Sequence, residues 1–121
     1  MTDPTIPTVT VIEAAARLEA MTEPRPLLVD VRERNEFALM RAPGAVLMPL
    51  STFTTTYEQL PTDRPLLMMC AVGGRSARAT EFLRANGYTD AANVAGGISA
   101  WNAAGLSVRT GTPGDGEGDL T

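Results

Sequence analysis

Histidine and lysine are absent from this sequence of 121 residues, and cysteine occurs once. A Cys-His catalytic pair, a Schiff-base lysine and a histidine-ligated metal site are therefore excluded. The single cysteine also excludes an internal disulfide, a dithiol redox pair and a cysteine-ligated zinc site. Any sulfur chemistry here must be activated by backbone dipoles or arginine, and an external partner must reset the cysteine.

The sequence also lacks long apolar runs and a strong positive charge. No stretch approaches the ~18 consecutive apolar residues of a membrane span, and the first residues have neither the basic start nor the apolar core of a signal peptide. The net charge of −4 argues against a nucleic-acid-binding or anionic-membrane surface. Together with a free thiol, these features predict a cytoplasmic protein with no nucleic-acid or membrane partner.

A hydrophobic content of 44% over this length predicts one compact domain. We expect the domain to occupy residues 8–109, after a flexible N-terminus at residues 1–7. Residues 110–121 are acidic and rich in glycine, with no apolar residue from 111 to 119, and we expect a disordered tail there.

Strand and helix patterns alternate along the domain. Nearly continuous apolar runs predict buried strands at 27–31 and 65–69, and weaker patterns indicate strands at 45–47 and 92–94. Helices are predicted at 11–21, 34–40, 51–60, 76–86 and 98–104. Thr10 and Glu13 have capping-box spacing at the first of these helices, and Gly87 and Gly105 are expected to follow the last two. The alternation predicts an α/β fold, a parallel sheet with helices on both faces.

Cys70 directly follows the predicted strand 65–69, the end at which open parallel sheets bind ligands. Gly73 and Gly74 allow a tight turn, and a helix is expected to begin at Ser76. Backbone N–H groups of such a loop and helix terminus favour thiolate over thiol. We therefore expect the pKa of Cys70 to lie below the ~8.5 of a free cysteine.

Three segments carry a resemblance to a known family: residues 28–33 with 36–37 and 43–45, the loop 70–75, and residues 93–101 with 104–106. In this order and spacing the chain resembles the rhodanese family, the single-domain sulfurtransferases, over nearly all of residues 8–109. The resemblance implies a sheet of about five strands. The chain departs from the family at residues 40–42, Met-Arg-Ala, where Gly-His-Ile is usual.

The resemblance implies that Cys70 is the catalytic nucleophile and carries sulfur as a persulfide, with neither cofactor nor metal. It implies a sulfane donor such as thiosulfate or a persulfide, and as acceptor cyanide or a thiol, for example thioredoxin or glutathione. The related phosphatase and arsenate-reductase branch has five residues between cysteine and arginine, whereas four separate Cys70 from Arg75. The active-site loop that follows Cys70 is expected to bind the substrate through Ala71, Val72, Gly73, Gly74, Arg75 and Ser76.

Four of the candidate site residues are charged. Arg75 has two expected roles, steering an anionic donor and bracing the loop. Because Ala71 and Val72 are uncharged, the resemblance leaves the donor open. Asp30, Arg32 and Arg41 are candidate supporting residues, and they are of the type that more often fixes loops by ion pairs or packing than takes part in chemistry.

Two alternatives to an independent enzyme remain open. The chain could be a non-catalytic rhodanese-like binding or regulatory module, or a sulfur carrier that docks on a partner protein. Inactive family members commonly lose the cysteine, so the presence of Cys70 favours sulfur transfer.

Overall fold

The computed structural model describes residues 6–120 and contains one sheet of five parallel strands. The order across the sheet is β1-β5-β4-β2-β3. The strands are β1 (Thr8–Val9), β2 (Leu27–Asp30), β3 (Val46–Leu47), β4 (Leu66–Met69) and β5 (Ala91–Val94). The predicted α/β fold with a parallel sheet is confirmed. Within the described residues, no helix combines the length and hydropathy that a membrane span requires.

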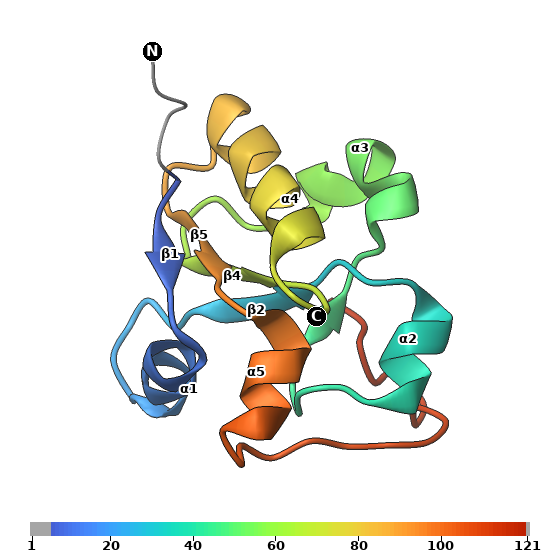
Figure 1. Cartoon of the computed structure of the whole chain (residues 1–121). Helices are drawn as coiled ribbons and strands as arrows, with labels where there is room; N and C mark the ends of the chain where they lie inside the picture. Colours follow the sequence, from blue (N-terminus) through green and yellow to red (C-terminus); the bar gives the residue numbers. More distant parts are fainter. Residues whose placement is uncertain (1–5, 121) are drawn as a thin grey trace.

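Helices cover both faces of the sheet (Figure 1). Helices α3 (Phe53–Thr56) and α4 (Gly74–Ala85) lie on one side, with α1 (Val11–Glu19), α2 (Arg34–Leu39) and α5 (Gly97–Ala103) on the other. Leu67 and Met69 of β4 belong to the core under α1 and α5, and Leu66 and Met68 belong to the core under α4. Both faces of the strand are thus buried, which explains its continuous apolar sequence.

Local signals placed most helix ends to within two residues. The Thr10 hydroxyl accepts a hydrogen bond from the backbone of Glu13, whose carboxylate accepts one from the Thr10 N–H, so the capping box is present. Gly87 and Gly105 follow α4 and α5 with φ of +94° and +78°. The predicted helix 51–60 is instead three short pieces, η1 (Leu50–Thr52), α3 and η2 (Tyr57–Gln59). Its run of β-branched threonines disfavours a continuous helix.

The prediction of a disordered tail is wrong for residues 111–120, which lie against α2 and β3. The Gly118 carbonyl accepts a hydrogen bond from Leu47 N–H at 2.8 Å, and a Cβ on Gly118 would stand 3.1 Å from the Phe37 ring. Glu117 forms an ion pair with Arg41. A composition low in apolar residues suggested disorder, but a buried arginine that needs a carboxylate holds this segment in place.

The predicted flexible N-terminus falls mostly outside the described residues. Of residues 1–7 only Ile6 and Pro7 are described. The Pro7 carbonyl accepts a hydrogen bond from Asn93 N–H at 2.8 Å, just before β1 pairs with β5. Strand β1 itself was not predicted, because Thr8 and Val9 form no apolar run before the helix that begins at Val11.

Candidate active site

Cys70 lies directly after β4, at the carboxyl edge of the sheet, and only 1% of its surface is exposed. The chain turns at Gly73, whose φ of +108° is suited to glycine. Gly73 N–H donates a hydrogen bond to the Cys70 sulfur at 3.1 Å. Helix α4 begins at Gly74, two residues before the predicted start, so its first turn is closer to the sulfur than expected.

Ser76 in the first turn of α4 is the second polar contact of the sulfur. Its hydroxyl oxygen is 3.3 Å from Cys70 Sγ, and the residue is fully buried. Burial raises the pKa of the Cys70 thiol, but the Ser76 hydroxyl and the N–H groups of Ser76, Gly73 and Val72 lower it by more. The net effect is a pKa below the ordinary value, because the thiolate gains donors that a neutral thiol does not need.

Asn93 completes this group, and the sequence analysis did not single it out. It lies in β5 and is 7% exposed. Its Oδ1 is 2.6 Å from the Ser76 hydroxyl oxygen, and its Nδ2 donates to the Gly73 carbonyl at 3.2 Å. A polar side chain inside a strand of otherwise small apolar residues was the available signal.

The N-terminus of α5 holds the Cys70 loop from the other side. Ile98 N–H donates to the Cys70 carbonyl at 2.9 Å, and Ser99 N–H donates to the Ala71 carbonyl at 3.1 Å. Gly97 permits this approach, because a Cβ there would lie 2.2 Å from the Cys70 carbonyl oxygen. Gly97 therefore sets how closely α5 can approach the Cys70 loop.

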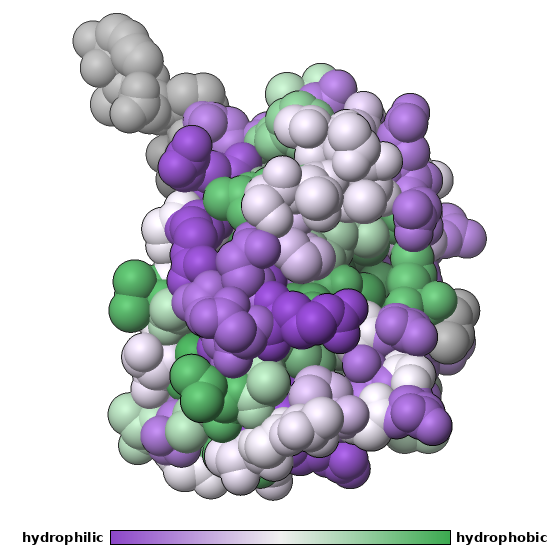
Figure 2. All heavy atoms as spheres, turned by 90° about the vertical axis from the view of Figure 1, so that its right-hand side faces the viewer, coloured by the Kyte–Doolittle hydropathy of each residue, from purple (hydrophilic) through white to green (hydrophobic). Residues whose placement is uncertain are grey.

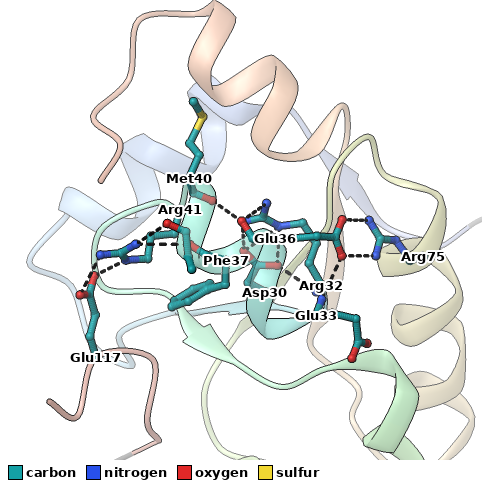
Figure 3. Close-up of polar contacts among 10 residues, drawn as sticks. Asp30, Arg32, Glu33, Glu36, Phe37, Met40, Arg41, Arg75 and Glu117 are labelled. Atoms are coloured by element: carbon teal, nitrogen blue, oxygen red, sulfur yellow. Dashed lines mark hydrogen bonds and ion pairs between the residues drawn. The ribbon is translucent and has the colours of Figure 1, made fainter. Parts of the chain in front are cut away.

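The Arg75 side chain reaches from α4 toward Glu36 of α2 (Figure 3). Its guanidinium donates two hydrogen bonds to the Glu36 carboxylate, at 2.7 and 2.8 Å. These bonds lower the pKa of Glu36 to about 2 and raise that of Arg75. Of the two roles expected for Arg75, the bracing role therefore has a partner, since the ion pair ties α4 to α2.

Asp30 and Arg32 form a buried ion pair at the end of β2, with 2.8 Å between Arg32 Nη2 and Asp30 Oδ2. Arg32 also donates to the carbonyls of Glu36 and Met40, at 3.2 and 2.7 Å. The pair therefore fixes α2 against the sheet, in agreement with the structural reading of these charges. By holding α2 it supports the Glu36–Arg75 contact (Figure 3).

Arg41 is not brought to the Cys70 loop by any contact in the described residues. It pairs with Glu117 and donates to the carbonyls of Phe37 and Gly111, at 3.3 and 2.6 Å. Figure 3 shows it on the opposite side of the Asp30–Arg32 pair from Arg75. Its supporting role is therefore to anchor the C-terminal segment rather than to shape the sulfur site.

The outer surface of the loop carries one large exposed apolar side chain. Val72 exposes 70% of its surface, and Ala71 is half-buried. On the face that carries α2 and α3, hydrophobic atoms form small separate patches among hydrophilic and near-neutral residues (Figure 2). Val72 therefore places an apolar side chain on the rim of the site.

Comparison with known proteins gives consistent matches. The sequence pattern of the rhodanese-like domain matches residues 13–104. A protein named sulfurtransferase from Allochromatium vinosum is 35% identical over 68% of this chain and 77% of its own length. Thiosulfate sulfurtransferase GlpE of Vibrio cholerae is 31% identical over 80% of this chain and 92% of its own.

A solved structure gives the same result for the fold. A rhodanese-related protein from Thermoplasma volcanium superposes with a TM-score of 0.77 at 27% identity, covering 85% of this chain and 97% of the other.

Some relatives are matched over less of their length. The match spans 59% of the uncharacterized protein YqhL of Bacillus subtilis, at 40% identity, and 19% of a Mycobacterium tuberculosis protein named "Probable adenylyltransferase/sulfurtransferase MoeZ".

Proposed function

Because this chain belongs to the family of rhodanese-like domains, we propose that it is a sulfurtransferase that carries sulfane sulfur as a persulfide on Cys70. The observation that carries the proposal is the environment of the sulfur. Cys70 Sγ accepts a hydrogen bond from Gly73 N–H at 3.1 Å and lies 3.3 Å from the Ser76 hydroxyl, at the start of α4. Such donors stabilise an anionic sulfur nucleophile without a general base.

The proposed reaction is a double displacement. The Cys70 thiolate attacks the outer sulfur of the donor, a new S–S bond forms on Cys70, and the donor's own bond to that sulfur breaks. The leaving group departs with the bonding electron pair, as sulfite from thiosulfate or as a thiolate from a persulfide. A thiol acceptor such as glutathione or thioredoxin, or cyanide in an assay, then attacks the outer sulfur and restores the Cys70 thiolate.

The rim favours a donor of low charge. Arg75 is neutralised by Glu36, and the loop positions Ala71 and Val72 are uncharged. A doubly charged donor such as thiosulfate finds no unpaired cation on residues 70–76, whereas a persulfide on a larger molecule can contact the exposed Val72. We therefore propose persulfides as better donors than thiosulfate.

Intact-mass measurement after incubation with a panel of sulfane donors tests the proposed function. We expect one added sulfur atom, removable by reductant, since Cys70 is the only cysteine. Cys70→Ser should lose both the adduct and the turnover of cyanide to thiocyanate. Turnover at the wild-type rate in Cys70→Ser would refute the proposal.

The alternatives to this proposal give different results. A non-catalytic binding module would form no adduct with any donor. A sulfur carrier would form the adduct but would not turn over with small thiols. A phosphatase would hydrolyse a phenyl phosphate ester, and this activity would disappear in Cys70→Ser.

A further inference from the structure

The hydroxyl of Ser76 has one proton and three acceptors within reach. Its oxygen lies 2.6 Å from Asn93 Oδ1, 3.3 Å from Cys70 Sγ and 3.3 Å from the Gly73 carbonyl oxygen. The contact with Asn93 is much the shortest, so the proton lies between these two oxygens. The sulfur then faces a lone pair of the hydroxyl oxygen, to which only a protonated thiol can donate.

The Asn93 amide cannot turn round to change this arrangement. Its Nδ2 donates to the Gly73 carbonyl at 3.2 Å, and a carbonyl oxygen can only accept. A flipped amide would bring Oδ1 against that carbonyl oxygen. Asn93 Oδ1 must therefore face Ser76, in a region where Ser76 is 0% and Asn93 7% exposed.

We propose that Asn93 is a positioning residue that holds the Ser76 proton away from the sulfur while Cys70 is a thiol, and that this proton turns to the sulfur on ionisation. In the thiol state, Cys70 S–H donates to Ser76 Oγ, which donates to Asn93 Oδ1. On ionisation the thiol proton leaves to water, Ser76 donates to Sγ, and Asn93 Oδ1 loses its partner. Because that oxygen is buried, its loss opposes ionisation.

The meaning of this arrangement for catalysis rests on the proposed function. Asn93 sets the fraction of Cys70 that is nucleophilic thiolate before a donor arrives. Ser76 can donate a charge-assisted hydrogen bond to the thiolate only by breaking its hydrogen bond to Asn93 Oδ1. The hydroxyl therefore stabilises the thiolate by less than it would with an apolar residue at position 93.

The charged groups around the sulfur form ion pairs, and replacement of Asn93 does not change these pairs. Arg75 on α4 is paired with Glu36 on α2, and Asp30 is paired with Arg32 at the end of β2. None of these four side chains has a hydrogen bond with Asn93 in the described residues. Replacing Asn93 thus removes two neutral hydrogen bonds, one with the Ser76 hydroxyl and one with the Gly73 carbonyl, and leaves both ion pairs in place.

The test is the pH dependence of Cys70 alkylation by iodoacetamide, with no sulfur donor present. In Asn93→Leu, and in the smaller Asn93→Ala, the midpoint should move to lower pH, and alkylation below the midpoint should be about tenfold faster. In a Ser76→Ala background the same substitutions should produce no downward shift. If a substitution only loosened the packing around position 93, the midpoint should rise instead, because a loosened loop withdraws its N–H donors from the sulfur.

An unchanged or raised midpoint in the Asn93 variants, or an equal fall in both backgrounds, would overturn the proposal. The wild type provides a second measurement, because its S–H stretching band comes from Cys70 alone. That band should have the frequency of a hydrogen-bonded thiol and should move to the free frequency in Ser76→Ala; a free band in the wild type contradicts the proposal. Persulfide loading is measured separately, so its failure would count against the proposed function and not against the titration.

Discussion

Gly97→Ala tests how the sulfur loop is held in place. Gly97 has a φ of +54°, and a Cβ there would lie 2.2 Å from the Cys70 carbonyl oxygen and 2.7 Å from that of Ala71. Both atoms belong to the backbone, so neither can rotate aside as the tip of a long side chain can. The substitution must therefore push α5 and the Cys70 loop apart.

Gly105→Ala is the matched control. Gly105 follows the same helix and has a φ of +78°, but a Cβ there would meet no atom within 4 Å. An alanine in the left-handed region costs about 1–2 kcal/mol, and overpacking typically adds about 1–3 kcal/mol. We expect the free energy of unfolding to fall by about 2–5 kcal/mol in Gly97→Ala and by about 1–2 kcal/mol in Gly105→Ala.

Urea unfolding measures both losses, and alkylation of Cys70 at neutral pH reports the site itself. In Gly97→Ala we expect slower alkylation, because the displaced loop no longer aligns its N–H groups with the sulfur. Gly105→Ala should alkylate at the wild-type rate. Equal losses of stability in the two variants, with unchanged alkylation in both, would refute the view that close contact with α5 positions the loop.

The other predictions concern the ion pairs. Glu117→Gln should destabilise the protein at neutral pH, because it removes the carboxylate that pairs with the buried Arg41, whereas replacement of the exposed Asp115 by Asn should not. Arg41 lowers the pKa of Glu117 to about 2, so this contribution is complete above about pH 4.5 and is lost as the pH falls toward 2. Urea midpoints of wild type and Glu117→Gln that stay equally far apart over this range would contradict the assignment. Glu36→Gln should cost about 0.5–1 kcal/mol, because its pair with Arg75 is partly exposed, and Arg75→Ala should cost little more in that background; additive losses in this double-mutant cycle would show that the pair does not act as a unit.

Local patterns in the sequence were enough to predict the layers of this fold. Apolar runs at β2 and β4 mark strands buried on both faces, and the Thr10 capping box acts within four residues. The Cys70 loop was also visible, because a cysteine, two glycines and a helix start are neighbours in the chain. Signals of this kind depend on residues that are close in sequence, so they can be recognised without knowledge of the tertiary structure.

The partners of the charged and polar side chains were decided only by the tertiary structure. Arg75 and Glu36 are 39 positions apart, and Arg41 and Glu117 are 76 apart. The composition of the C-terminal segment suggested disorder because it averages over many residues, whereas one carboxylate that reaches a buried arginine is enough to hold it. Asn93 was not predicted because its partner Ser76 lies 17 positions away in the chain. Its effect on the sulfur acts through Ser76 and exists only once β5 and α4 are packed together.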